Sequence, residues 1–386
     1  MSETKPSLRS DNRAPGRFLR NVLLKTLILL IFLSLGFAWL NPIQGMGRIS
    51  LYNTLYPGRL RLPFGEDFEQ SYNLSILQLE AMFASHEISA GDKPENELRV
   101  LLLGDSSIWG FLLSPDQTLS AELNKRDDVT DDNRIIKFYN LGYPTMSVMK
   151  DLMLLNFAQR YELDIVVWFV TLESLPLQKQ VESPLVQYNP EPALSLIDRF
   201  GLGIDSQDTR FIDRTFLDRT LVGQRRELAD LIRLQLLGVM WAATGIDHVI
   251  PKIYEPLQVE LEEDLDFQDY QPGDLNSEEL ALDVIQAGIH LMEETPVIIV
   301  NEPILIATGQ NSDLRYNSFY PRWAYDEYRE ILGAKALESN WSYLDLWDTV
   351  PAHMFTDSAI HYSPEGVKLV VDHLSATIRL AAHPLP

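Results

Sequence analysis

The sequence predicts an α/β protein with a five-stranded parallel sheet, a helical insertion and an N-terminal transmembrane helix. Short apolar runs bounded by turn residues alternate with helical patterns, which implies parallel strands covered by helices on both faces. One interval between these runs is far longer than a usual crossover connection. A separate apolar run near the N-terminus has about the length that a bilayer core requires.

The expected strands are short and rich in branched apolar residues, as buried parallel strands are. They are expected at Arg99 to Leu103, Ile135 to Tyr139, Ile165 to Val170, Val297 to Val300 and Tyr343 to Leu346. The helical patterns between them begin with serine, proline or acidic residues, which are helix start signals. Helices are expected at Ser114 to Lys125, Met146 to Tyr161, Asn276 to Glu294 and Pro364 to Leu380.

Composition limits the possible partners and cofactors. The chain has 386 residues, a formal net charge of -23 and no cysteine. Residues 1–25 hold six basic and two acidic side chains, a charge of +4, so the remainder carries -27. This acidic body repels nucleic acid and favours a neutral or cationic substrate. Without cysteine there are no disulfides or thiolate sites, and no histidine pair has metal-ligand spacing, so we expect no metal and no cofactor.

The apolar run from Val22 to Leu40 is 19 residues long, with Lys25 as its only charge. Basic residues flank only its start, so the positive-inside rule leaves residues 1–21 as a cytoplasmic tail and places the body outside. Small residues near its end would also suit the cleavage site of a signal peptide. The bulky Trp39 and Leu40 favour a retained single-pass anchor in the cytoplasmic membrane.

The rest of the chain is expected to form a connector and one main domain. Residues 41–97 are the connector, with one helix from Leu74 to Phe83. Residues 98–386 are the main domain, interrupted by the insertion at about 176–273.

Within the insertion, Leu217 to Ile246 has a helical pattern whose last part, Leu234 to Thr244, is almost wholly apolar. That part would suit a membrane-facing patch or a wall of a substrate site. Charged residues interrupt the run, and 11 residues cannot span a bilayer, so a helix packed on the domain is favoured.

The first expected strand ends in Gly-Asp-Ser-Ser, which places Ser106 at the carboxyl edge of the sheet. A serine there is a nucleophile only if a base reaches it. His361 lies in the loop before the last expected helix, and Asp357 precedes it by four residues, close enough to orient it. We therefore expect Ser106, His361 and Asp357 to form a catalytic set.

These two blocks, Gly-Asp-Ser-Ser and Asp357-x-x-x-His361, resemble the first and last blocks of the SGNH or GDSL hydrolase family. The resemblance covers roughly Leu98 to Leu175 and Thr295 to Leu380. It implies the flavodoxin-like sheet of the SGNH hydrolase fold, with Ser106 as nucleophile. It also implies an oxyanion hole formed by the amides of Ser106 and Gly142, although Gly142 would suit a strand-ending turn equally well.

The chain departs from the family pattern at two places. An asparagine is expected after the third strand, but the sequence there contains Thr171 and Glu173. Thr171 could supply a hydroxyl donor, whereas a charged Glu173 would oppose an oxyanion unless it turned away or took up a proton. The aspartate and histidine of the last block are one residue further apart than usual. A Ser-His dyad, or Asp345 or Asp348 as the orienting acid, therefore remains an alternative.

Pocket candidates follow the fourth strand and occupy the aromatic-rich run from Arg315 to Tyr328. Tyrosine, tryptophan and arginine at a sheet edge suit a sugar or a polar acyl acceptor, although core packing explains aromatic residues equally well. We expect these four residues to bind substrate: Asp105, Asn301, Glu302 and Arg322.

The resulting hypothesis is a serine carboxyl-ester hydrolase or O-acyltransferase that acts outside the membrane on acylated cell-envelope carbohydrate. Acetyl is favoured by family analogy alone. Its partners would be the ester substrate and the membrane. A catalytically degenerate protein that binds carbohydrate or scaffolds an envelope complex is the alternative, supported by the missing asparagine. Lipid-ester hydrolysis, with Leu234 to Thr244 as a wall, is a third possibility.

Overall fold

The computed structural model describes residues 14–55, 58–64, 74–248, 250 and 259–382. The chain divides into two compact units, one made of residues 1–46 and 214–229 and the other of residues 47–213 and 230–386. The predicted basic tail lies outside the described residues over 1–13. The division does not test the predicted domain boundaries, which stay predictions.

The larger unit is built on one parallel sheet of five strands, in the order β2-β1-β3-β4-β5. This is the flavodoxin-like order, so the predicted fold class is confirmed. The chain changes direction across the sheet between β1 and β3, which is where such folds place their ligands. The strands are β1 (Glu97–Leu103), β2 (Ile135–Asn140), β3 (Ile165–Val170), β4 (Val297–Asn301) and β5 (Ser342–Asp345).

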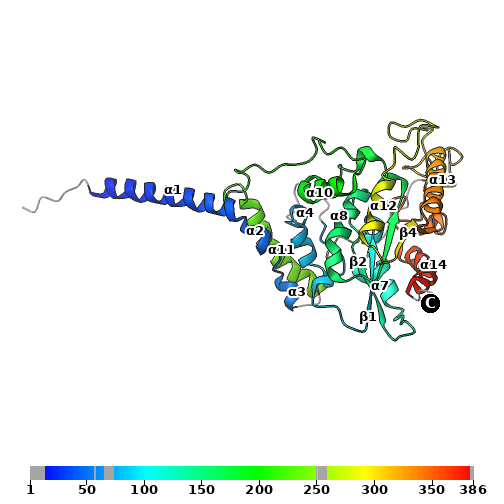
Figure 1. The fold of residues 1–386 in the computed structure, drawn as a ribbon, viewed down its shortest axis with the longest axis horizontal. Coiled ribbons are helices and arrows are strands. Elements are labelled where there is room, and N and C mark those ends of the chain that lie inside the picture. Colours follow the sequence, from blue (N-terminus) through cyan, green and yellow to red (C-terminus); the bar gives the residue numbers. More distant parts are fainter. Residues whose placement is uncertain (1–13, 56–57, 65–73, 249, 251–258, 383–386) are drawn as a thin grey trace, which may run out of the picture. The chain divides into compact units, whose positions relative to one another are not determined.

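Helices cover both faces of the sheet, as the alternation of strand and helix predicts (Figure 1). One face packs against α7 (Leu119–Asn124) and α14 (Pro364–Ala382). The other packs against α8 (Val148–Ala158), α12 (Leu282–Leu291) and α13 (Arg322–Glu338). Successive strand residues enter opposite cores, because side chains alternate along a strand. All six residues of β3 are buried for this reason.

Two helices differ from the expected ranges. The helix expected from Asn276 forms only over α12, because the stretch before it folds as turns and a bridge to Pro176. The run from Arg315 to Tyr328 was expected to line a pocket. It contains the start of α13, whose tyrosines are buried in the core. Aromatic residues at helical spacing were therefore core residues here.

The insertion is helical, with α9 (Pro184–Gln187), α10 (Pro190–Phe200) and α11 (Arg225–Thr244). On α11, Leu231 and Leu234 are buried, whereas Ile232, Leu236 and Met240 are more than half exposed. The short elements elsewhere are α6 (Ser106–Trp109), η2 (Pro115–Gln117), η3 (Gln159–Tyr161), η4 (Leu172–Ser174), η5 (Leu177–Lys179) and η6 (Ala352–Met354).

The expected connector contains α3 (Leu51–Leu55), α4 (Leu74–Leu77), α5 (Leu79–Ala84) and η1 (Glu87–Ser89). The single helix expected from Leu74 to Phe83 is thus broken at Gln78, which has extended backbone angles.

The smaller unit contains α1 (Ala14–Leu40) and α2 (Pro42–Met46). Within α1, Gly16–Leu40 is the one helix among the described residues that is long and apolar enough to cross a membrane. A signal sequence would have the same length and composition, so both interpretations of this segment stay open.

Candidate active site

Ser106 is presented by a tight turn between β1 and α6. Gly104 has a φ of 156°, and a Cβ there would lie 2.8 Å from Cγ1 of Ile108. Asp105 caps the short helix, because its Oδ1 accepts a hydrogen bond from the Ser107 N–H at 2.8 Å. Ser106 therefore occupies the first helical position, at the carboxyl edge of the sheet, with its side chain half-buried.

The structure brings the three predicted catalytic residues together. His361 Nε2 lies 2.8 Å from Ser106 Oγ, although 255 residues separate them in the chain. His361 Nδ1 lies 2.8 Å from Asp357 Oδ1 on the other side of the ring. A backbone hydrogen bond from Thr356 N–H to the His361 carbonyl closes the loop between them at 2.8 Å. The four-residue spacing thus still allows the contact between acid and histidine.

The charge state of the acid suits this arrangement. Burial opposes the ionisation of Asp357, but the hydrogen bond with His361 and the charge of that ring outweigh burial and lower the pKa of Asp357. The stabilisation from this contact is therefore present above the ordinary aspartate range and is lost as pH falls through the lowered pKa. Asp345, the alternative acid, accepts hydrogen bonds from Asn301 and Arg329 instead.

A cavity of about 500 Å³ opens at the Ser106–His361 pair. Phe111 covers one side of the histidine, with its ring centroid 4.9 Å from that of His361. Most of the lining is apolar, and it comes from segments that the sequence did not single out. The lining residues are Phe64, Ser106, Phe111, Pro144, Thr145, Met146 and His361. Pro144 to Met146 follow β2 at the carboxyl edge, a position that could have identified them.

The two further oxyanion donors expected from the sequence are engaged elsewhere. The N–H of Gly142 donates to Oδ1 of Asn140 at 3.0 Å. A Cβ on Gly142 would lie 2.4 Å from the Trp109 nitrogen, so this glycine permits a close approach of two backbones. Thr171 is fully buried, and its hydroxyl lies 2.9 Å from the Tyr320 hydroxyl. Thr171 does not line the cavity at Ser106, and its role as an oxyanion donor stays a prediction.

The Ser106 N–H is the donor that the turn leaves available. It belongs to the first residue of α6, where helices have no intrahelical partner for their N–H groups. Glu173, which could have opposed an oxyanion, forms an ion pair with Lys179 and accepts a hydrogen bond from Gln268 at 3.0 Å. Its charge is thereby paired.

None of the four expected substrate-binding residues lines this cavity, and their contact with substrate stays a prediction. Asp105, Asn301 and Glu302 are all buried. Asn301 donates to Asp345 Oδ1 at 2.8 Å and accepts a hydrogen bond from Tyr328 at 2.9 Å, because α13 covers the end of β4. Arg322 donates from Nε to the Ser312 carbonyl at 2.7 Å and stacks on a tyrosine.

A buried lysine joins two of the loops around the cavity. Lys150 Nζ donates to the carbonyls of Gly104, at 2.8 Å, and Tyr143, at 3.0 Å. It also forms an ion pair with Asp151 at 2.7 Å, and neither side chain is more than 3% exposed. Sequence reasoning missed this residue, although a lysine inside a strongly apolar helix was a visible signal.

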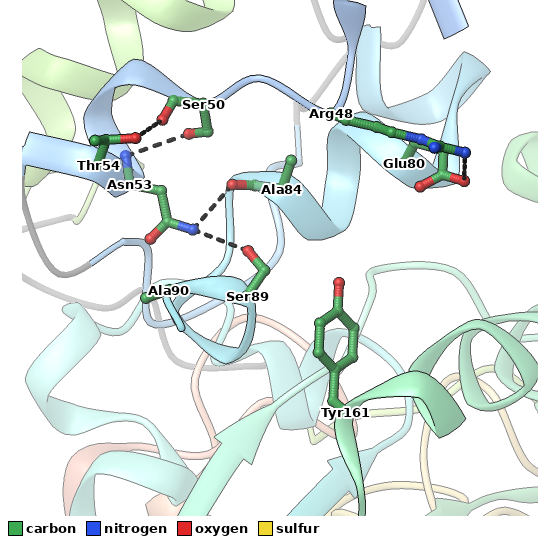
Figure 2. A pocket seen from close by; sticks show the side chains of 9 residues that line it. All are labelled: Arg48, Ser50, Asn53, Thr54, Glu80, Ala84, Ser89, Ala90 and Tyr161. Atoms are coloured by element: carbon green, nitrogen blue, oxygen red, sulfur yellow. Dashed lines mark hydrogen bonds and ion pairs between the residues drawn. The ribbon is translucent and has the colours of Figure 1, made fainter. Parts of the chain in front are cut away.

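A second cavity, of about 480 Å³, has a different character. Figure 2 shows that its polar groups bond to one another: Arg48 with Glu80 at 3.1 Å, and Asn53 with Ser89 at 2.9 Å. Its lining contains no histidine and hence no serine–histidine pair. No group of three or more histidine, aspartate or glutamate side chains in the described part of the chain could hold a metal ion.

No protein-family model matches the chain, and no curated protein does. A carbohydrate acetylesterase family member from Sinorhizobium meliloti is similar, with 12% identity, a TM-score of 0.33, and 73% of this chain and 98% of that chain covered. A lipolytic G-D-S-L family member from Veillonella parvula DSM 2008 is also similar, with 12% identity and a TM-score of 0.34. The match covers 73% of this chain and 99% of that chain.

The inhibitor-bound aryl esterase of M. Smegmatis gives 12% identity and a TM-score of 0.33, with 73% of this chain and 98% of that chain covered. At such identities and TM-scores, the function of this chain has to be inferred from its own side chains.

Proposed function

We propose that this protein is a serine ester hydrolase or O-acyltransferase of the SGNH type. The observation that carries the proposal is the hydrogen-bonded series Ser106 Oγ, His361 Nε2, His361 Nδ1 and Asp357 Oδ1, with both contacts at 2.8 Å. A nucleophile bonded to a base, with the base oriented by a third group, is the arrangement that activates a weak nucleophile.

In the proposed reaction, Asp357 holds His361 in the tautomer with its proton on Nδ1, which leaves Nε2 free to accept. His361 Nε2 takes the proton of Ser106 as Oγ attacks the ester carbonyl. The protonated ring then gives this proton to the departing alcohol, and an acyl-enzyme remains on Ser106. Water or a hydroxyl group of an acceptor attacks the acyl-enzyme, again with His361 as base, and releases Ser106.

The Ser106 N–H is the oxyanion donor in this proposal. Gly142 and Thr171 donate or bond elsewhere in the structure, and one missing donor typically costs on the order of 10²–10³-fold in rate. We therefore expect slow turnover unless substrate binding turns the Gly142 N–H away from Asn140.

The proposed substrate is an acylated cell-envelope carbohydrate, with the catalytic domain over residues 98–386 outside the cytoplasmic membrane. The apolar lining of the cavity, above all Phe64, Phe111 and Met146, suits the alkyl part of an acyl group. The apolar helix that follows the basic N-terminal segment suits a membrane anchor, with the positive segment in the cytoplasm.

The test uses the full chain in detergent with p-nitrophenyl acetate as substrate. Ser106→Ala abolishes release of p-nitrophenol, because Ser106 has the hydroxyl in the cavity that is hydrogen-bonded to His361. It leaves the thermal unfolding curve unchanged, since Ser106 is only half-buried. Full activity in Ser106→Ala would refute the assignment.

The second candidate is a catalytically degenerate protein that binds carbohydrate, and the engaged Gly142 and Thr171 donors favour it. A fluorophosphonate probe separates the two functions, because only an activated Ser106 reacts with it. Labelling of the wild type but not of Ser106→Ala supports the enzyme, and an unlabelled wild type supports the binding protein.

A further inference from the structure

Glu302 is a buried carboxyl group that the proposed reaction does not use. It directly follows β4, its side chain is only 1% exposed, and its N–H donates to the Val170 carbonyl at 3.0 Å. A buried acidic side chain is costly unless its groups are satisfied, so its neighbours indicate what it does.

Those neighbours flank the proposed nucleophile on both sides and include the residue that follows the proposed base. Glu302 Oε2 accepts a hydrogen bond from Ser107 Oγ, the residue after Ser106, at 2.5 Å. The carboxyl also hydrogen-bonds to Asp105, the residue before Ser106. Tyr362, the residue after His361, approaches Oε2 with its hydroxyl at 3.4 Å and donates to the Pro303 carbonyl at 3.1 Å.

Two carboxyl groups can hydrogen-bond only if one of them holds a proton. Oε1 of Glu302 is buried and receives no hydrogen bond from any described residue, which fits an oxygen that carries a proton of its own. Burial and then the charge of Asp105 raise the pKa of Glu302 well above its ordinary value. Asp105 Oδ1 is meanwhile the acceptor for the Ser107 N–H.

We propose that Glu302 is a positioning residue whose protonated carboxyl joins the turn that carries Ser106 to the segment that carries His361. The inference rests on the proposed function, because it concerns the alignment of the same two side chains. Ionised Glu302 would lie against ionised Asp105 inside the protein, and their repulsion would separate the two segments. Activity therefore depends on a proton that never takes part in the reaction.

Three tyrosines and the carboxyl group of Asp105 act electrostatically on Glu302. Burial raises the pKa of each neighbouring tyrosine well above its ordinary value, so these hydroxyls stay neutral. The titratable groups that interact with Glu302 are Asp105 before α6, Tyr320 before α13, Tyr325 on α13 and Tyr362 before α14.

The experiment compares Glu302→Gln and Glu302→Ala with the wild type, using p-nitrophenyl acetate from pH 5 to pH 10. The glutamine amide can donate to Asp105 while its oxygen accepts from Ser107, so Glu302→Gln keeps kcat within about threefold of the wild type. Glu302→Ala lowers kcat by about tenfold or more and changes KM less, because alignment and not substrate contact is lost.

A merely structural role of Glu302 would not change the pH dependence of kcat, so this pH profile distinguishes the two roles. The wild type loses kcat reversibly as pH rises through the pKa of Glu302, whereas Glu302→Gln has no proton to lose and keeps its alkaline plateau. Asp345→Asn is the matched control, since it removes a carboxyl at the end of the adjacent strand without touching the Ser106 turn. It keeps the wild-type profile.

Thermal unfolding keeps the test independent of turnover. The folded pKa of Glu302 lies above its unfolded value, so the stability that its proton supplies is full at low pH and is lost as pH rises. Glu302→Gln does not show this loss. The proposal is overturned if Glu302→Gln also loses kcat at high pH, or if Glu302→Ala keeps the wild-type kcat. A wild type inert to ester and probe refutes the proposed function instead, and the unfolding curves then decide the role of the proton.

Discussion

Two strand ends of one sheet carry polar residues, and the structure uses them in opposite ways. After β1, the chain turns sharply and leaves Ser106 half-buried at the cavity. After β4, Asn301 and Glu302 remain inside, where α13 and Tyr362 supply their partners. The difference shows that a position at the carboxyl edge is not sufficient to place a side chain in the lining of this cavity. A turn that breaks the strand direction, such as the one at Gly104, is also needed.

The largest expected effect on kcat concerns Asp357, which orients the histidine at the cavity. Asp357→Asn lowers kcat for p-nitrophenyl acetate on the order of 10²–10⁴-fold, because the amide no longer fixes the tautomer of His361. Stopped-flow or steady-state kinetics measure the loss. The control is Asp348→Asn, which changes an exposed acid from the same candidate set and keeps wild-type activity. Equal activities of the two variants would leave a Ser106–His361 dyad as the catalytic unit.

Lys150→Met tests the buried lysine that joins two loops around the cavity and pairs with Asp151. Removal of the ammonium leaves Asp151 buried without its ion pair, which costs about 3–5 kcal/mol of unfolding free energy at neutral pH. Burial already raises the pKa of Asp151, and loss of Lys150 raises it further. The cost therefore shrinks as pH falls and Asp151 takes up a proton.

Urea unfolding at pH 7 and pH 5 measures this cost. Lys335→Met is the matched control, because that lysine pairs with an exposed Glu338 and contributes little. A destabilisation that is small, or the same at both pH values, would contradict the buried ion pair as the source.

The sequence predicted the three inner strands well, because β1, β3 and β4 are buried on both faces and therefore form nearly continuous apolar runs. It also predicted the Ser106, His361 and Asp357 set, since serine after a glycine turn and histidine before a capped helix are local signals. Only part of the cavity lining was predictable, because Phe64 and Phe111 are apolar residues that resemble core residues in sequence. Likewise, nothing local distinguishes Glu302 at a buried junction from a glutamate that faces substrate.

The smallest effect is expected at the end of β3, and it tests the contrast between exposed and buried strand ends most directly. Thr171 occupies the place where an asparagine donor was expected, but its hydroxyl bonds to Tyr320 inside the core. Thr171→Val keeps the shape and removes that hydrogen bond, so we expect a loss of about 1 kcal/mol in stability and less than about a threefold change in kcat. Chemical unfolding and ester kinetics measure the two quantities. A loss on the order of 10²–10³-fold in kcat would instead show that Thr171 turns toward the oxyanion when substrate is bound. The end of β3 would then act like the end of β1, and the contrast between exposed and buried strand ends would hold for β4 alone.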